Sequence, residues 1–201
     1  MKKFRFGVNV GPSRSRAEWA EKARNLEDLG YATLTVPDHL TDFSAPMPAL
    51  ISAAEATRSL RVGTNVLNND FRHPVLVARE AATIDLLTEG RLQLGLGAGY
   101  VQSEYEQAGL DFDGGGIRVE RLGEAVALIK GLLRGEQVAV AGRHYRVTGH
   151  AIFPLRWTRT CDSRSHVLRC SPTGFDFGSD RGERDGWLDY PDCNVAHLSM
   201  R

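Results

Sequence analysis

Apolar residues in the first two thirds of the chain switch between two spacings, the two-residue period of strands and the three-to-four-residue period of helices. Strand-like stretches begin near residues 4, 32, 60 and 91, and a helix-like stretch follows each of them. Such a repeat implies parallel strands, because parallel neighbours need a connection as long as a helix. The predicted elements are strands over residues 4–10, 32–36, 60–67 and 91–96, and helices over residues 16–29, 46–58, 74–89 and 118–134.

Local signals mark where two of these helices begin. Ser15, with Glu18 three residues later, has the pattern of a capping box at the start of the first helix. Pro74 suits the first turn of the third helix, where its missing N–H group has no intrahelical partner to lose. Further along, we predict a polar connection over residues 102–116 and a hairpin over 138–147, with Ala141 and Gly142 at its turn.

The repeat is compatible with an open doubly wound sheet or with an eight-stranded barrel. Four units use about 135 residues of this chain, whereas a complete barrel typically needs about 250. We predict an α/β fold of TIM-barrel-like (β/α) units, with four parallel strands in the order 1-2-3-4 that form the N-terminal half of a (β/α)8 barrel over residues 1–154. Residues 155–201 lose the periodicity and are expected to be an irregular tail of low foldability, with strand candidates at 166–170 and 194–198.

Charge and cysteine content narrow the classes of partner. Lys and Arg number 25 and Asp and Glu number 25, so the formal net charge is zero, and electrostatic binding to nucleic acid or a membrane surface is not expected. No apolar run reaches the roughly 20 residues of a bilayer span, and we expect a cytoplasmic protein with a small-molecule substrate. The three cysteines lack close pairing, so neither a disulfide framework nor a metal site is expected.

Asp38 and His39 follow the second predicted strand directly after Pro37. A histidine can move a proton near neutral pH while a neighbouring carboxylate orients it, and in barrels the residues at carboxyl strand ends are typically catalytic. The alternative is that Asp38 caps the next segment and His39 is an ordinary surface residue. The spacing alone leaves both interpretations open.

The fourth predicted strand runs into the alternating glycines Gly95, Gly97 and Gly99. Glycines at a strand end allow a ligand to approach the backbone closely, which a Cβ atom would block. The run is not a dinucleotide fingerprint, because the pattern G-x-G-x-x-G needs a further glycine where Tyr100 stands.

Other polar residues flank these strand ends. Asn65, Asn68 and Asn69 offer donors and acceptors for the edge of a heteroaromatic ring, or serve ordinary turn chemistry. Glu104 and Glu106 follow the glycine run. They close over a ligand or, in the interpretation we favour, belong to a solvated acidic loop.

Four stretches together resemble one family, the bacterial luciferase-like oxidoreductases, and within it most closely the branch that depends on coenzyme F420. They are VPDHL, VGTNVLNNDFRHPVLVAREAATIDLLTEGRLQLGLGAGY, SEYEQAGLDF and RVERLGEAVALIKGLLRGE. The resemblance covers residues 4–154. It implies a (β/α)8 barrel that binds F420, or alternatively FMN, at the carboxyl ends of its strands, and that transfers hydride or activates oxygen at the ring.

Carried onto this sequence, the resemblance assigns roles to the residues already singled out. It implies that Asp38 and His39 flank the ring near the substrate, with His39 as the proton donor or substrate contact. It also implies a non-proline cis peptide at Asn65-Val66 behind the ring, with Asn68 near the polar edge of the ring. The implied floor and wall after the fourth strand are Gly97, Ala98, Gly99 and Tyr100.

The resemblance ends where the family would continue into a fifth strand, and the family's phosphate-binding loops come from the second half of the barrel. We therefore expect the chain alone to bind F420 or FMN weakly if at all, and to self-associate through open barrel edges. The leading interpretation is an oxidoreductase of this family. The alternatives are a truncated or frameshifted non-catalytic remnant, and a small doubly wound binding domain whose strand order would reverse.

Overall fold

The computed structural model describes residues 5–153 and, by their backbone only, residues 195–198. Four parallel strands form the body of the main sheet in the predicted order 1-2-3-4, without the reversal of a doubly wound sheet. Val8, Leu34, Val62 and Leu92 pair in one row across the sheet. The four strands are β1 (Gly7–Asn9), β2 (Thr33–Val36), β3 (Arg61–Thr64) and β5 (Leu92–Gly97).

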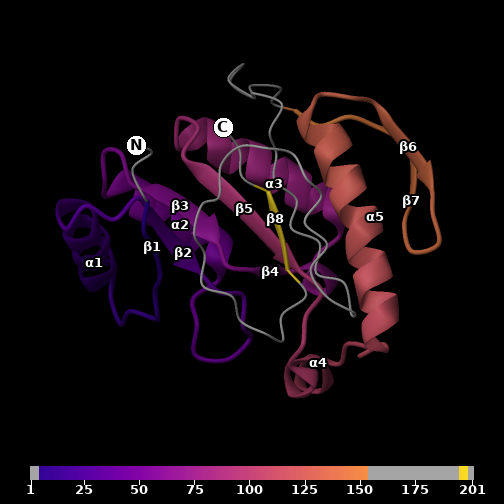
Figure 1. The fold of residues 1–201 in the computed structure, drawn as a ribbon, viewed down its shortest axis with the longest axis horizontal. Helices are drawn as coiled ribbons and strands as arrows, with labels where there is room; N and C mark the ends of the chain where they lie inside the picture. Colours follow the sequence, from indigo (N-terminus) through magenta and orange to yellow (C-terminus); the bar gives the residue numbers. More distant parts are fainter. Residues whose placement is uncertain (1–4, 154–194, 199–201) are drawn as a thin grey trace.

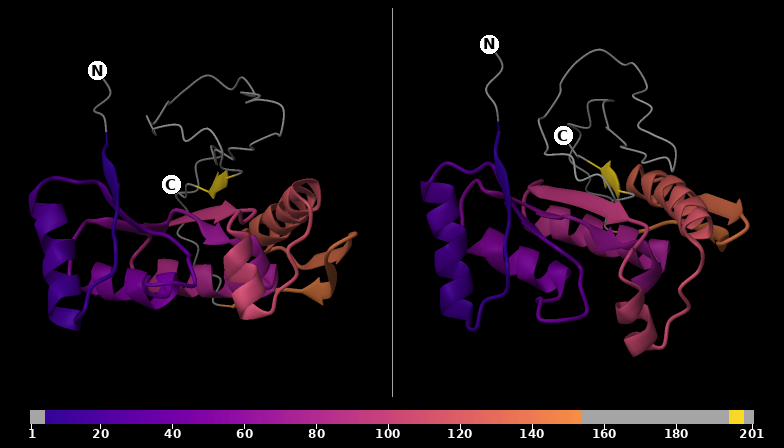
Figure 2. Two further views of the ribbon diagram at one scale, coloured as in Figure 1. Left: turned by 90° about the horizontal axis from the view of Figure 1, so that it is seen from below. Right: turned by 60° about the horizontal axis from the view of Figure 1, so that its bottom comes forward.

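Helices connect these strands and cover one face of the sheet (Figures 1 and 2). Buried side chains on that face, such as Leu34, Val62 and Leu92, pack with Leu50 and Ala81 from two of the helices in one core. In barrel units, parallel strands follow one another in sequence order, and their helices all lie on one side of the sheet. The helices are α1 (Arg16–Asp28), α2 (Pro46–Glu55), α3 (Pro74–Leu87), α4 (Gln102–Ala108) and α5 (Gly115–Leu133).

The third predicted strand, residues 60–67, is divided in two. After β3 the chain passes through a cis peptide at Asn65-Val66, which confirms the implied bond. The chain then forms the short strand β4 (Leu67–Asn68), and a 3-10 helix, η1 (Asn69–Phe71), follows it. Because β4 also pairs with β5, it remains beside the fourth strand, with Asn68 opposite Gly97.

The strand candidate at 194–198 is confirmed as β8 (Val195–Leu198), whereas 166–170 lies outside the described residues. β8 pairs antiparallel with β5. Leu96 and Gly97 pair with β4 and with β8, so β8 lies on the other edge of β5. The expectation that the fourth strand has an open edge is therefore wrong at these residues.

The structure differs from the prediction at two helices, α2 and α4. The predicted second helix ends at Glu55 rather than residue 58, where Thr57 donates its hydroxyl back to the carbonyl of Ala53 at 2.9 Å. The predicted polar connection 102–116 instead contains α4. Its buried residues are Glu104 and Tyr105, so it has no apolar stripe by which a sequence pattern could reveal it.

The capping box of α1 is confirmed in its first half, because Ser15 Oγ accepts from the Glu18 backbone N–H at 3.1 Å. The Glu18 carboxylate turns back to the N–H of Arg14 rather than to that of Ser15. The helix is tied to its neighbour by Trp19, whose indole N–H donates to the carbonyl of Ala49 on α2 at 3.0 Å.

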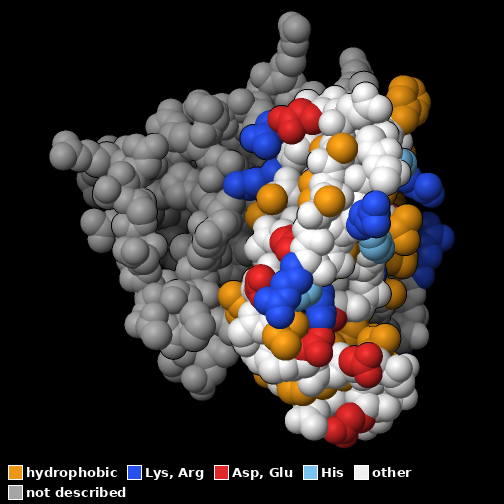
Figure 3. Space-filling view, turned by 90° about the vertical axis from the view of Figure 1, so that its right-hand side faces the viewer, with side chains coloured by type: hydrophobic (Ala, Val, Ile, Leu, Met, Phe, Trp, Pro, Cys, Tyr) orange, Lys and Arg blue, Asp and Glu red, His pale blue; other side chains and the backbone are white. Residues whose placement is uncertain are grey.

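The predicted hairpin is present as β6 (Val138–Ala141) and β7 (Arg146–His150). Its turn begins one residue later than predicted, since Ala141 is still in β6 and Gly142 N–H donates to the Tyr145 carbonyl. The Glu124 carboxylate of α5 accepts three backbone N–H groups from the turn, which fixes the hairpin to the helix. On this side of the molecule basic and acidic side chains are interspersed (Figure 3).

No helix among residues 5–153 combines the length and the apolar character that crossing a membrane requires.

Candidate functional site

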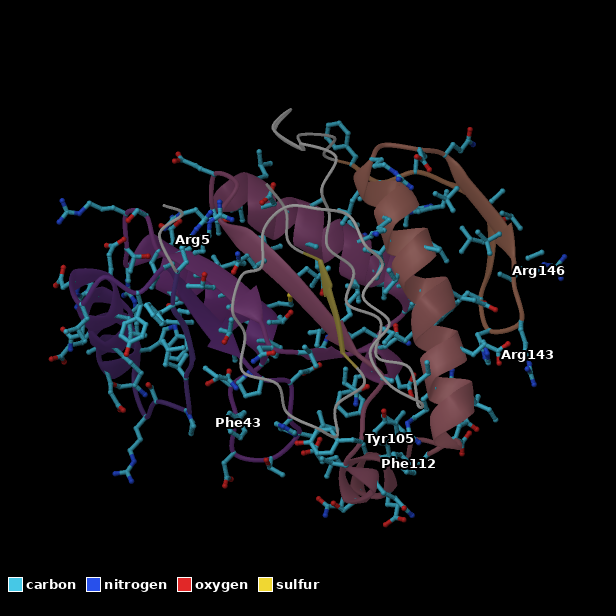
Figure 4. The ribbon with its side chains drawn as sticks, viewed as in Figure 1. Arg5, Phe43, Tyr105, Phe112, Arg143 and Arg146 are labelled. Atoms are coloured by element: carbon cyan, nitrogen blue, oxygen red, sulfur yellow. The ribbon has the colours of Figure 1, made fainter. Side chains whose placement is uncertain are left out.

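The carboxyl ends of β2, β4 and β5 come together at one end of the sheet. Asp38 follows β2 by two residues, Asn68 ends β4, and Gly99 follows β5 by two residues. The loop after β2 and the region of α4 lie at this same end, where Phe43, Tyr105 and Phe112 are labelled (Figure 4). In parallel barrels this end carries the active site.

Asp38 joins three segments at the floor of this end. Its side chain is 2% exposed and forms a two-point ion pair with Arg72, at 2.5 Å and 3.2 Å. The same carboxylate accepts the backbone N–H of Asn68 at 2.9 Å. Arg72 and the Asn68 N–H thus occupy both oxygens of Asp38. The carboxylate that contacts His39 belongs to another residue.

His39 projects from the rim beside Asp38. Its Nδ1 atom lies 2.8 Å from Glu104 Oε1 of α4. The imidazole is 25% exposed, whereas the Glu104 side chain is only 8% exposed. Glu104 is therefore not part of a solvated acidic loop, and the interpretation favoured from the sequence is wrong for this residue.

Two aromatic side chains pack near the His39 ring. The centroid of Phe43 lies 5.6 Å away at a tilt of 45°, and that of Tyr100 lies 6.0 Å away in an edge-on arrangement. Tyr100 is 63% exposed and Leu40 is 49% exposed. The rim around His39 is therefore an exposed aromatic and apolar surface.

Tyr105 anchors α4 to the strand ends. Its hydroxyl lies 3.0 Å from Asn68 Oδ1 and 3.2 Å from Asp70 Oδ2, and its ring packs edge-on against Phe112. Burial, assisted by the Asp70 carboxylate, raises the pKa of Tyr105 to about 12. The phenol therefore stays protonated and serves as a donor across the physiological range.

The glycines after the start of β5 allow other parts of the protein to pack closely against the backbone at this end. Gly99 has a φ of +74°, and a Cβ atom there would overlap the Tyr105 hydroxyl and lie 2.8 Å from the Asn68 amide nitrogen. A Cβ atom on Gly95 would overlap the Thr64 carbonyl. At these two glycines the missing side chain makes room for protein atoms, not for a ligand as expected.

All nine residues predicted for the site lie at or directly after the carboxyl ends of β2, β3, β4 and β5. Asn65 and Val66 form the cis peptide, Ala98 is buried, and Tyr100 is exposed. The nine are Asp38, His39, Asn65, Val66, Asn68, Gly97, Ala98, Gly99 and Tyr100. Asn69, considered beside them, turns away, because its amide donates to Tyr145 Oη of the hairpin at 3.0 Å.

The sequence did not reveal three partners of these residues. Arg72 carries no signal that distinguishes it from other surface arginines, although it neutralises Asp38. Glu104 and Tyr105 lie in a polar segment whose helical character depends on contacts far away in the sequence. Within the described ranges no three His, Cys, Asp or Glu side chains are grouped as a metal site.

An open groove of about 450 Å³ lies elsewhere, between the first turn of α3 and β7. His73 is one of its lining residues and is the N-cap of α3, where its Nδ1 accepts the Val75 N–H at 3.3 Å. That agrees with the ordinary role of a residue beside a helix start. The groove contains none of the strand-end residues, so it is not the candidate site.

The strand end suits a flat, partly polar ring. The rim offers exposed aromatic surface at Tyr100 and a half-buried Phe43, and Asn68 presents its amide nitrogen toward Gly99. Among the described residues the Asn68 amide nitrogen has no acceptor within hydrogen-bond distance, while its oxygen is satisfied. Exposed stacking surface near a buried amide with an unused donor is compatible with a heteroaromatic cofactor.

Comparison with known proteins gives a consistent picture. The sequence model of the luciferase-like monooxygenase family matches residues 2–160. The F420-dependent glucose-6-phosphate dehydrogenase of Beutenbergia cavernae is 36% identical over 135 residues, which are 63% of this chain and 40% of that protein. The 4-hydroxyprotoasukamycin monooxygenase of Streptomyces nodosus subsp. asukaensis is 33% identical over 149 residues, 68% of this chain and 39% of that protein.

Solved structures share the fold. An F420-dependent secondary alcohol dehydrogenase in complex with an F420-acetone adduct superposes with a TM-score of 0.68 at 21% identity, over 76% of this chain and 49% of the other. The FMN-bound oxygenating constituent of 3,6-diketocamphane monooxygenase from Pseudomonas putida gives 0.63 at 17% identity, over 73% and 44%. The chain thus spans 39% to 49% of the length of these relatives.

Proposed function

Because the chain belongs to the luciferase-like monooxygenase family, we propose that it is part of an oxidoreductase that holds the ring of coenzyme F420 at the carboxyl ends of β2, β4 and β5. The single observation that carries the proposal is the position of His39. This partly exposed imidazole packs near two aromatic rings, beside the strand ends that bear the Asn68 amide. The substrate is a small molecule that reaches the ring from the His39 side.

The residues at the strand ends have separate tasks in this proposal. Asn65, Val66 and Asn68 would hold the back and the polar edge of the ring, and Gly97, Ala98, Gly99 and Tyr100 would form the wall after β5. The bound deazaflavin supplies hydride transfer. His39 moves a proton, and the rings of Tyr100 and Phe43 pack beside its imidazole and orient it.

Asp38, which the sequence suggested as a catalytic partner, has a positioning role in the proposal. Its carboxylate is saturated by Arg72 and by the Asn68 N–H, so it holds the β2 and β4 ends in register rather than exchanging protons with substrate.

FMN with monooxygenation is the second candidate. A specific finding favours it, because relatives of this chain include a named monooxygenase and a structure that contains FMN. The remnant alternative gains no support from these relatives, which carry enzyme names.

The test is a comparison of His39→Ala with the unaltered chain. We expect turnover to fall by about 10²-fold or more, while the dissociation constant for F420 changes less, since proton transfer occurs in the transition state and ring binding is spread over many contacts. Fluorescence titration with F420 and with FMN gives the affinities, and the rate of hydride transfer gives turnover. Weakened binding with unchanged turnover would mean that His39 only holds the ring.

Two further parts of the proposal concern the whole chain. We place it in the cytoplasm, as expected from its sequence. We also propose self-association through the β1 edge, because among the described strands β1 pairs only with β2. Sedimentation at two protein concentrations checks this, and a monomer at both would contradict it.

A further inference from the structure

We propose that Glu104 is a positioning residue that fixes His39 as its Nδ1–H tautomer and so makes Nε2 the nitrogen presented to substrate. The inference rests on the proposed function only for the use that is made of Nε2. The tautomer itself is a property of the folded chain and can be measured without cofactor.

The contact between the two side chains is short, and the carboxylate is its acceptor. Glu104 Oε1 lies 2.8 Å from His39 Nδ1. An ionised carboxylate only accepts hydrogen bonds, so the proton of this pair belongs on Nδ1. Among the described residues, His39 is the only hydrogen-bond partner of the Glu104 carboxylate, whose side chain is 8% exposed. A carboxylate so well buried is costly without a donor, which makes the bond to His39 strongly preferred.

The surroundings of the ring leave one direction open. Phe43 and Tyr100 contact the imidazole within 5.6 Å and 6.0 Å of its centroid and limit its rotation. With Nδ1 directed at α4, Nε2 lies on the opposite side of the five-membered ring. The side chain is 25% exposed, so part of the ring remains open to solvent while Nδ1 is engaged by Glu104.

The nearest competing carboxylate does not take over this task. Asp38 is adjacent in sequence to His39, but Arg72 and the Asn68 N–H occupy its oxygens. The orienting carboxylate therefore comes from a segment 65 residues away in sequence.

The position of Glu104 is itself fixed by its neighbour in sequence. Tyr105 is fully buried, and its hydroxyl lies within hydrogen-bond distance of Asn68 Oδ1 at the end of β4 and of Asp70 Oδ2 in η1. Phe71 packs against the same ring at a centroid distance of 5.2 Å. This anchor holds α4 against the strands. It thereby fixes the backbone of Glu104 at a position from which its carboxylate reaches His39.

In the proposed reaction the pair acts as a relay with one mobile proton. Nε2 accepts the proton that the substrate loses, the Glu104 carboxylate stabilises the imidazolium, and the same proton later leaves from Nε2 to water. The Nδ1 proton stays between the two residues throughout. Glu104 thus does not touch the substrate and acts through His39.

Nitrogen-15 NMR of the imidazole rings tests the inference on the whole 201-residue chain. The chain has six histidines, and the signal that disappears in His39→Gln identifies the ring in question. We expect the chemical shifts of the neutral ring to report Nδ1–H. In Glu104→Leu, which removes the acceptor, the ratio of Nδ1–H to Nε2–H should fall by about tenfold or more, because a hydrogen bond to a charged group is lost.

Glu106→Leu is the matched control. Glu106 is two residues further along α4, and its exposed carboxylate contacts Gln102 at 2.7 Å rather than His39. This variant should keep the tautomer of the unaltered chain. Glu104→Gln, which retains shape and an amide oxygen, should give a ratio between the two extremes and guards against a folding defect in the leucine variant.

An Nε2–H ring in the unaltered chain would overturn the inference, and so would a ratio that Glu104→Leu leaves unchanged in a folded protein. Both outcomes are independent of F420 and FMN. A chain that shows the Nδ1–H signature but binds neither cofactor would contradict the proposed function and leave the role of Glu104 in fixing His39 intact.

Discussion

Gly99 and Gly109 have nearly the same backbone conformation, with φ values of +74° and +71°, but very different surroundings. At Gly109 a Cβ atom would meet nothing within 4 Å, whereas at Gly99 it would overlap the Tyr105 hydroxyl and crowd the Asn68 amide. The first glycine is needed only for its dihedral angle. The second is needed also because the strand-end network occupies the space of its side chain.

This difference gives a matched pair of substitutions. We expect Gly109→Ala to lower the free energy of unfolding by about 1 kcal/mol, the cost of a left-handed conformation. Gly99→Ala should lower it by about 2–4 kcal/mol, because overpacking adds to the same backbone cost. Urea denaturation measures both values. Equal losses would mean that Tyr105 and Asn68 move aside without penalty.

At the scale of single residues, the sequence predicted which side chains lie at the site better than it predicted the hydrogen-bond partners of those side chains. His39 was identifiable because a histidine after a strand end is chemically unusual. Its partner Glu104 was not, since nothing local distinguishes a buried carboxylate from a solvated one. Asp38 was assigned the orienting role because it is adjacent in sequence, whereas the fold gives that contact to Glu104.

At the scale of elements, Glu27 shows how one side chain joins a helix to a strand. From the last turn of α1 its carboxylate accepts the backbone N–H groups of Arg58, Ser59 and Leu60, just before β3, and the Ser59 hydroxyl. Burial raises the pKa of Glu27, but these hydrogen bonds outweigh it and lower the pKa to about 2.

A pH dependence follows from this shift. A carboxyl group whose folded pKa lies below its ordinary value of 4.5 contributes stability above pH 4.5 and loses it as the pH falls toward 2. Glu27→Gln should therefore destabilise the protein at neutral pH and flatten the decline of its unfolding free energy between these two pH values. Urea denaturation at several pH values measures this, and a variant with the same slope would show that Glu27 is not the responsible group.

Elements with apolar periodicity were predicted well, and those held by polar contacts were not. α3 and α5 agree with the predicted helices to within three residues at each end. α4 was missed because its two buried residues are Glu104 and Tyr105. The break between β3 and β4 was anticipated from family resemblance alone, because the spacing of residues 60–67 is that of one continuous strand.

At the scale of the whole molecule, the four main parallel strands, β1, β2, β3 and β5, lie side by side in their sequence order. Consecutive right-handed βαβ units give this arrangement, so the parallel sheet and its outer helices were predictable from the repeat. The pairing of β8 with β5 was not, because an antiparallel strand joined through a long connection leaves no periodic signal.

The convergence of distant segments at one rim is the central claim. It depends on contacts between residues 30 to 65 positions apart, such as Asp38 with Asn68 and His39 with Glu104. If the rim holds a cofactor ring, ligand contacts must appear at all of these segments together.

An amide NMR titration of the chain with F420 tests this claim most directly, since it detects weak binding and reports where the ligand lies. We predict weak, saturable shift changes concentrated at His39, Asn65 to Asn68 and Gly97 to Tyr100. The groove residues His73 and Arg146 serve as internal controls and should stay unchanged. Saturable changes centred on that groove, or no changes at the strand ends with either F420 or FMN, would contradict the account.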